Sequence, residues 1–146
     1  LFLVIALFGV FGFVDAMQIE AWHTLDSDAA WGLYKSNVAP AFRISWFAAI
    51  VGLSIVYYYF KKDKSEAIGL VAAAYVMAGM GVEDVWFFIL GKYPMTACMS
   101  WFDYFPYSVL NPLFGVECTS PVVLIVSTGL GLLLGFKLFK YLKRRF

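Results

Sequence analysis

The chain has 146 residues, of which 62% are hydrophobic, 20% aromatic and only 14% charged, and its formal net charge is +1. This composition, with a mean hydropathy of +0.79, excludes an ordinary soluble domain. We therefore predict a single all-α integral membrane domain over residues 1–146, a four-transmembrane-helix bundle with a long extracytoplasmic loop between its third and fourth helices.

Four stretches are apolar almost all the way round, as expected of helices surrounded by lipid. Each, with its flanks, approaches the ~20 residues needed to cross a bilayer. The predicted spans cover approximately residues 1–22, 40–60, 66–90 and 121–142. A secretory signal peptide competes for the first stretch, but its Gly12, Asp15 and Gln18 suit a packed helix better, so we expect a retained span.

Local signals mark where three of these helices begin. Pro40 opens the second span, and Ser65 followed by Glu66 can open the third, with its acid at the positive end of the helix dipole. Ser120-Pro121 is an N-cap and N1 pair for the fourth.

Basic residues gather in the loop at 61–64 and in the tail from Lys137 onward, which together hold eight of the eleven. The positive-inside rule places both segments in the cytoplasm, so both termini are cytoplasmic and loops 23–40 and 92–120 are extracytoplasmic. The cytoplasmic segments hold eight basic and two acidic residues, a net +6, and the outer half holds three basic and eight acidic, a net −5. The basic tail indicates contact with anionic lipid and no nucleic-acid role.

Small residues recur on the third and fourth spans, where Gly131 and Gly135 form a small-xxx-small pair. Such residues let helix backbones approach closely in lipid. The pair suits contact within the chain or with a second copy, and we favour the first. Met77 and Met80 are read as gap-filling core residues. Beyond membrane lipids, the expected partners are other membrane chains or a second copy.

The most informative residues are Glu83 and Asp84, two adjacent carboxylates inside the third apolar run. Ionisable groups at such depth are costly and usually face a partner, a cavity or water. Asp15 lies at a similar depth on the first span, with Gln18 on the same face, and Arg43 begins the second span. Because neighbouring helical residues point about 100° apart, we expect one acid to face the first span and the other the second or fourth.

Three interpretations of this polar cluster stay open. Asp15, Arg43 and Glu83 can form a structural ion-pair network, which we slightly favour because a planar guanidinium suits two carboxylates. The same groups can form a substrate, proton or ion site, or they can contact another subunit. If the protein is an enzyme, Glu83 and Asp84 are its candidate catalytic residues.

A metal site is a minor alternative. Glu20 and His23 have the spacing found in carboxylate-bridged di-iron helices, but that chemistry needs the motif twice. The chain has one histidine, which excludes bis-histidine haem and two-histidine copper sites within one copy. A divalent metal held by Asp15, Glu20, His23 and Glu83 stays open, and the cofactor is otherwise unknown.

Loop 92–120 is rich in aromatic residues and broken by prolines, which indicates a lid over the outer mouth of the bundle. Cys98 and Cys118, the two cysteines of the chain, both fall in this loop. On the oxidising face of a membrane we expect them to form a disulfide. Closing a loop of this length stabilises the fold by roughly 3 kcal/mol in the chain-entropy model.

The segment Gly81-Val82-Glu83-Asp84-Val85-Trp86-Phe87-Phe88 resembles the acidic pair followed by aromatic residues in the small membrane-embedded lycopene cyclases. In that family the carboxylates serve acid–base chemistry on a polyene, and the resemblance implies this role for Glu83 and Asp84. The match is confined to this segment, and Gly81 or Val82 stands where the family has a proline.

These observations favour a small polytopic subunit of a larger membrane complex that contributes an acidic site in the outer leaflet. One alternative is a stand-alone membrane enzyme that acts on a lipid or isoprenoid. Another is a bundle that conducts protons or cations.

Overall fold

The protein is almost entirely helical in a computed structural model that describes residues 1–23, 34–92, 94–99, 102 and 105–145, with the backbone alone at 20–23, 34, 35 and 39. The elements in chain order are α1 (Phe2–His23), the π-helical η1 (Tyr34–Val38), α3 (Ala39–Lys61), α4 (Lys64–Gly79), α5 (Val82–Gly91), α6 (Tyr107–Leu113) and α7 (Pro121–Arg145). Within the described residues, strand pairing is limited to an isolated bridge between Met99 and Thr119. The all-helical fold class is confirmed.

Within the part of the chain that the structure describes, three helical segments are long and apolar enough to cross a membrane: Phe2–Ile19, Ser36–Lys61 and Pro121–Arg145. The expected third span, 66–90, is instead divided into α4 and α5, which meet at a bend of 65°. At 1.5 Å per residue, α4 rises about 24 Å and α5 adds roughly 6 Å along the same axis, so the bent pair is just long enough for a fourth crossing.

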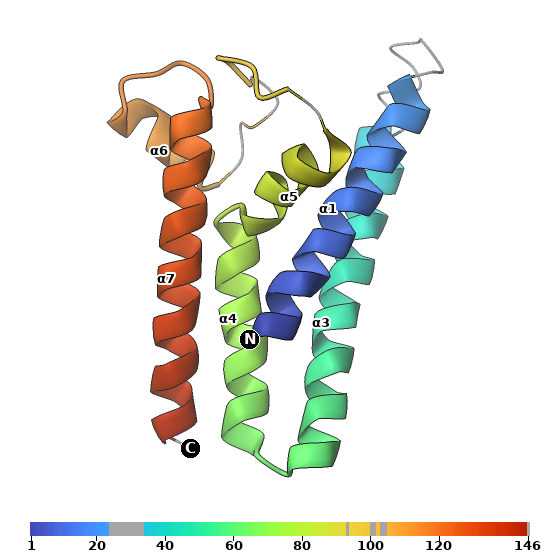
Figure 1. The fold of residues 1–146 in the computed structure, drawn as a ribbon, viewed down its shortest axis with the longest axis vertical. Helices are drawn as coiled ribbons and strands as arrows, with labels where there is room; N and C mark the ends of the chain where they lie inside the picture. Colours follow the sequence, from blue (N-terminus) through green and yellow to red (C-terminus); the bar gives the residue numbers. More distant parts are fainter. Residues whose placement is uncertain (24–33, 93, 100–101, 103–104, 146) are drawn as a thin grey trace.

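The most extensive helix packing is between α4 and α7 and between α1 and α5, and α3 packs mainly against α4. In Figure 1, α4 and α7 run side by side, and α5 turns away from α4 to lie against α1. Aromatic contacts join α1 to α3. The ring centroids of Phe8 and Trp46 lie 5.3 Å apart, and those of Phe11 and Phe42 lie 5.8 Å apart. This arrangement brings the start of α5 close to both α1 and α3.

Two hydrophobic cores both include residues of α5. One joins α1, α3, α4 and the start of α5 and contains Val4, Phe8, Ile50, Leu70, Ala74, Met77 and Val82. The other joins α1, α5, α7 and the segment between α5 and α7, and contains Ala16, Phe87, Phe88, Met99, Phe102, Tyr107, Val123 and Leu124. The second core ties the loop after α5 to the bundle, so the described part of that loop is a packed lid. We use "lid" for residues 94–99, 102 and 105–120.

Gly131 and Gly135 of α7 pack inside the chain, as we favoured from their spacing. A Cβ atom added to Gly131 would lie 2.6 Å from Met80 Cβ, and one added to Gly135 would lie 2.7 Å from Met77 Cγ. Met77 itself is fully buried. Close approach of α7 to α4 therefore depends on these two glycines.

The start of α4 differs in detail from the expectation. Asp63, rather than Ser65, is the N-cap, and its carboxylate accepts hydrogen bonds from the Glu66 main-chain N–H (2.9 Å) and the Ser65 hydroxyl (2.7 Å). The expected starts of the other two helices are confirmed. α3 has proline in its first turn, and at the start of α7 the Val123 N–H donates a hydrogen bond to Ser120 Oγ.

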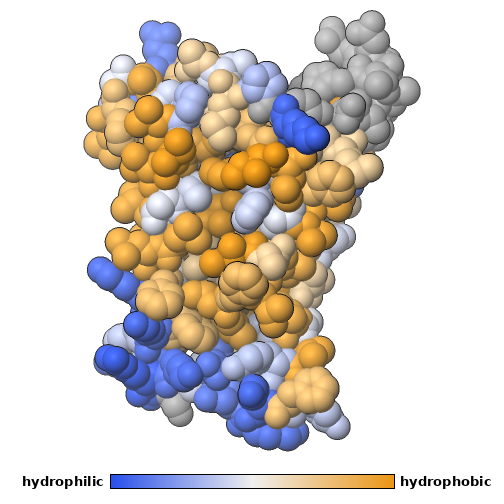
Figure 2. All heavy atoms as spheres, in the orientation of Figure 1, coloured by the Kyte–Doolittle hydropathy of each residue, from blue (hydrophilic) through white to orange (hydrophobic). Residues whose placement is uncertain are grey.

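One end of the bundle is strongly polar. The α3–α4 connection and the C-terminal end of α7 lie together there, as Figure 1 shows, and Lys143 and Glu66 form a 2.7 Å ion pair across them. In Figure 2 the most hydrophilic side chains gather at this end, below a broad apolar band. The lid lies at the opposite end, whereas Leu1 lies at mid-height beside α4.

Candidate functional site

The candidate site begins at the break between α4 and α5. Gly81 adopts a left-handed φ of +81°, which ends the helical ladder of α4 and redirects the chain. Glycine reaches this conformation without the steric cost that a Cβ imposes. The free carbonyls are paired by α7, because the Ser127 hydroxyl donates to Met80 O (2.7 Å) and the Thr128 hydroxyl donates to Gly81 O (3.0 Å). A break in an apolar environment is tolerated when neighbouring groups satisfy the backbone in this way.

Both acids lie in the first turn of the new helix. With Gly81 as the N-cap, Glu83 and Asp84 are the second and third residues of α5. Unpaired N–H groups and the positive end of the helix dipole are found there, so the position stabilises negative charge. The break therefore converts two acids of an expected mid-span into acids at a helix N-terminus.

Glu83 is surrounded by charges from three helices. The charges of Asp84, Asp15 of α1 and Arg43 of α3 all act on its carboxylate. Gly12 makes this approach to α1 feasible, because a Cβ there would lie 2.9 Å from Glu83 O and 2.7 Å from Phe87 N. The residues that we expected to cluster are thus electrostatic neighbours, and their interpretation as an ion-pair network stays a prediction.

One oxygen of this carboxylate has no protein partner. Glu83 Oε1 and Gln18 Oε1 are buried and accept no hydrogen bond. The Trp46 Nε1–H group is also buried and donates none. Buried polar atoms are normally paired, and an orphan needs an explanation such as an unseen water, an ion or a functional role. Gln18 belonged to the expected cluster, but Trp46 did not.

Asp84 faces the lid, which differs from the expected orientation toward the second or fourth span. The Tyr107 hydroxyl, at the start of α6, donates a 2.7 Å hydrogen bond to Asp84 Oδ2. Burial raises the pKa of Tyr107 above its usual range, and the charge of Asp84 and the hydrogen bond to it raise it further. The hydroxyl therefore stays protonated and acts as a donor. Sequence reasoning could not find this pair, because it depends on how the lid folds.

No family model matches the chain, and comparison with curated proteins and with solved structures finds no significant relative. The resemblance of the acidic segment to lycopene cyclases therefore has no support from these comparisons. Function has to be argued from the geometry alone.

The expected metal ligands Glu20 and His23 have side chains that lie outside the described residues. Their role as ligands therefore stays a prediction. Among the side chains that the structure does describe, no group of three or more histidine, cysteine, aspartate or glutamate residues is arranged to hold a metal ion.

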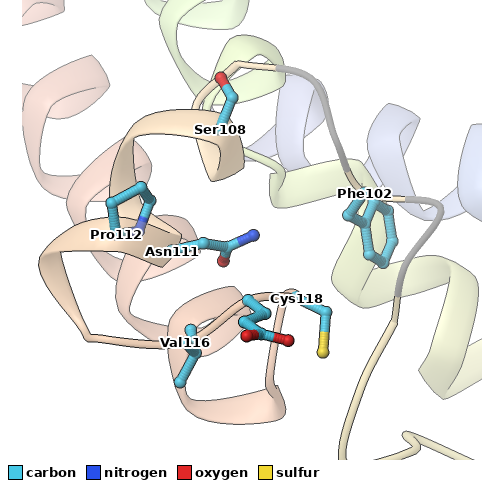
Figure 3. Close-up of a pocket in the computed structure, with 7 residues that line it drawn as sticks. Phe102, Ser108, Asn111, Pro112, Val116 and Cys118 are labelled. Carbon is cyan, nitrogen blue, oxygen red and sulfur yellow. The ribbon is translucent and has the colours of Figure 1, made fainter.

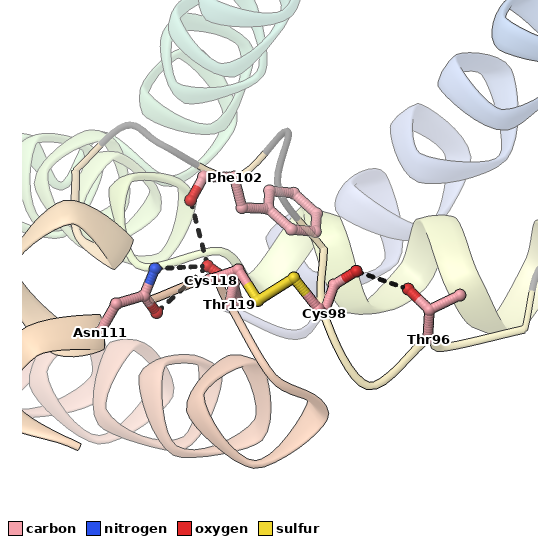
Figure 4. Close-up of a disulfide and its surroundings, with 6 residues drawn as sticks. All are labelled: Thr96, Cys98, Phe102, Asn111, Cys118 and Thr119. Atoms are coloured by element: carbon pink, nitrogen blue, oxygen red, sulfur yellow. Dashed lines mark hydrogen bonds between the residues drawn. A yellow bond between two sulfur atoms is a disulfide. The ribbon is translucent and has the colours of Figure 1, made fainter. Parts of the chain in front are cut away.

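The expected disulfide is present. Cys98 and Cys118 are bonded, with their Cα atoms 5.3 Å apart. Figure 4 shows how the bond joins the two ends of the lid beside Thr119. The Thr119 hydroxyl donates to Phe102 O (3.1 Å) and accepts from the Asn111 amide (3.1 Å), and the Met99 N–H donates to Thr119 O (2.9 Å). The lid is therefore cross-linked by covalent and polar contacts.

A cavity of about 320 Å³ lies within the lid. Figure 3 shows the Asn111 side chain and the Phe102 ring at its wall. Its other lining residues are Ser108, Pro112, Val116, Glu117 and Cys118. Neither Glu83 nor Asp84 lines this cavity, so it is separate from the acidic site.

Proposed function

We propose that the protein is a small polytopic subunit of a larger membrane complex, and that Glu83 binds a proton or another monovalent cation. The observation that carries the proposal is the buried Glu83 Oε1 without a hydrogen-bond partner. An ionised carboxylate in this state is costly in apolar surroundings, and a bound proton or cation offsets that cost.

The neighbouring charges support a cation of low charge. Asp15, Glu83 and Asp84, opposed by Arg43, give the cluster a net charge of −2 when all four groups are ionised. A residual negative charge attracts cations, but the guanidinium already supplies part of the compensation. A divalent metal usually takes several carboxylate or carbonyl ligands in a closed shell, which the described side chains do not provide.

The interrupted helix supports the same function. Ion sites in membrane proteins are often built where a spanning helix is broken, because the break exposes backbone groups and helix ends at membrane depth. The α4–α5 break has this character, with Glu83 in the first turn after it. We place the site in the outer leaflet, near the end of the bundle that carries the lid.

For topology we propose four crossings, with both termini and the α3–α4 connection in the cytoplasm and loops 23–40 and 92–120 outside. The cluster of basic residues at one end and the disulfide at the other support this orientation. The described residues contain no free cysteine, so Lys62→Cys and Thr96→Cys introduce unique thiols at opposite ends. A membrane-impermeant maleimide should label the second in right-side-out vesicles and the first only after permeabilisation. The reverse pattern would overturn the orientation.

The cation site can be tested with a hydrophobic carbodiimide, which adds to protonated carboxyl groups in apolar surroundings. We expect mass spectrometry to find the adduct on Glu83 and to show that its yield falls as pH rises. Glu83→Gln should abolish the adduct, and Glu117→Gln, which changes an exposed lid carboxylate, should leave it unchanged. An unmodified Glu83 at every pH at which the protein stays folded would contradict a proton site.

Assembly with other chains is a separate part of the proposal. α3 is the least buried of the three long spans, and several of its large apolar side chains are exposed, including Ile44, Phe47, Ile55 and Val56. Extraction in a mild detergent, followed by size analysis and mass spectrometry, should show a specific partner chain. A monomer that carries only lipid would refute the subunit role without affecting the cation site.

A further inference from the structure

The two acids of the site connect it to different parts of the molecule. The Glu83 carboxylate experiences the charges of Asp15 and Arg43, whereas Asp84 Oδ2 accepts the Tyr107 hydrogen bond. Asp84 also directly follows Glu83 in the first turn of α5. The contact between lid and acidic site therefore runs through Asp84.

The Tyr107 side chain is closely fitted to the break. Tyr107 is fully buried, and its hydroxyl occupies the space that a Cβ at Gly81 would need. The same glycine that redirects the chain thus provides room for the phenol. Removing the hydroxyl leaves the ring in place but opens a gap at the side of Asp84 that faces the lid.

The position of Tyr107 is set by the lid. Its ring packs 5.0 Å from the Phe102 ring. The carbonyl of Phe102 accepts the Thr119 hydroxyl, and Thr119 follows the disulfide-bonded Cys118, as Figure 4 shows. A chain of buried contacts therefore leads from the disulfide to the Tyr107 ring, and from its hydroxyl to Asp84.

We propose that Tyr107 is a positioning residue that latches the lid onto Asp84 and closes the Glu83 site to water on the lid side. This inference rests on the proposed role of Glu83 as a binding site and adds how access to that site is controlled. When the hydrogen bond breaks, the Tyr107 ring stays in the core, and the gap left beside Asp84 admits water and small cations to Glu83. With the bond formed, this route is closed.

Access can be measured without relying on cation binding. Glu83→Cys places a unique free thiol at the site, and a charged, water-soluble methanethiosulfonate reagent modifies it only where water enters. In the full-length protein in detergent micelles, Tyr107→Phe should raise the modification rate about tenfold, the factor expected from losing one hydrogen bond to a charged group. Asp84→Asn, which keeps a neutral acceptor, should raise it by about threefold, because hydrogen bonds to ionised groups are stronger.

Two controls separate a latch from a general loosening of the fold. Tyr75→Phe removes an exposed hydroxyl from α4 and should leave the modification rate of the thiol at position 83 unchanged. A thiol at the fully buried Ala73 should stay slow to react when Tyr107→Phe is added. The latch is overturned if Tyr107→Phe changes the rate at position 83 by less than about twofold, or if the thiol of Ala73→Cys speeds up equally. Because thiol modification needs no bound cation, the latch can stand even if carbodiimide labelling rejects the proton site.

Discussion

Ser127 of α7 donates a 2.7 Å hydrogen bond to the main-chain carbonyl of Met80, the residue at which α4 ends. Thr128 does the same for the next carbonyl, that of Gly81. Two consecutive hydroxyls of one helix thus satisfy the backbone at the break in another. In the proposed membrane topology no water replaces such bonds, so the shape of the broken segment depends on α7.

Replacing Ser127 with alanine should therefore destabilise the protein although the change is small. Ser127 is fully buried, and the substitution leaves the Met80 carbonyl unpaired. We expect the free energy of unfolding to fall by about 1–2 kcal/mol. Adding Thr128→Val should lower it again. The measurement is unfolding by a denaturing detergent, followed by circular dichroism.

Ser45→Ala is the matched control for that experiment. Ser45 is exposed on α3, and its hydroxyl bonds only to the carbonyl of Ala41 within the same helix. Its removal should change the free energy of unfolding by less than about 0.5 kcal/mol. If Ser127→Ala has as small an effect as this control, the break does not depend on the α7 hydroxyls.

Gly81→Ala tests the other requirement of the break. The residue has a φ of +81°, which costs an L-amino acid about 1–2 kcal/mol. Its new Cβ would also collide with the Tyr107 hydroxyl and lie 2.9 Å from Asp84 Oδ2. We expect a loss of about 3 kcal/mol or more in stability, because the strain and the overpacking add.

Gly79→Ala provides the comparison. A Cβ at Gly79 meets nothing within 4 Å and the residue has no left-handed φ. Stability should stay the same or rise slightly, since alanine is the better helix former. Equal losses at the two glycines, measured in the same unfolding assay, would show that the space beside Tyr107 is not limiting.

The sequence alone predicts the apolar helices well, because a membrane requires long uninterrupted apolar runs and these are visible in composition. It does not predict the break in the third run. Gly79 and Gly81 continue a series of small residues that reads as a helix-packing stripe, and nothing local distinguishes a glycine that packs from one that bends. The adjacent hydroxyls of Ser127 and Thr128 inside an otherwise apolar helix were a usable signal, since hydroxyls in such helices often pair with free carbonyls.

At the candidate site, depth along the helices is the ground for expecting Asp15, Arg43 and Glu83 near one another, and their grouping as one site stays a prediction. The orientation of Asp84 was not predictable, because its partner comes from α6, a helix of seven residues within an irregular loop. The disulfide was predictable, since the chain offers only two cysteines. Interactions set by helix periodicity, or by the pairing of two lone cysteines, can thus be inferred, whereas a contact such as that of Tyr107 with Asp84, which depends on how the loop folds, cannot.

The contact between α4 and α7 gives a third prediction. Gly131→Ala would place a Cβ 2.6 Å from Met80 Cβ, so the helices must separate or tilt. Overpacking of this kind typically costs about 1–3 kcal/mol. On the same helix, a Cβ at Gly129 meets nothing within 4 Å, and Gly129→Ala should be neutral. If instead Gly129→Ala alone disrupts co-purification with a partner chain, that glycine faces another subunit.

Asp63 gives a prediction for how the stability of the protein depends on pH. The hydrogen bond from the Ser65 hydroxyl, followed by that from the Glu66 N–H, holds the pKa of Asp63 below its usual value. A carboxyl whose pKa is lower in the folded state contributes stability above its unfolded pKa, about 4, and loses that contribution as pH falls through the folded pKa. Acidification below about pH 4 should therefore weaken the start of α4.

Asp63→Asn isolates this contribution. Asparagine is also a good N-cap but does not titrate in this range. The wild-type protein should melt at a higher temperature than the variant at neutral pH, and the difference should shrink as the pH falls below about 4. Carboxylates remote from Asp63 titrate alike in both proteins, so their effects cancel in the difference. A gap in melting temperature that stays constant with pH would show that the charge of Asp63 adds nothing to its role as a cap.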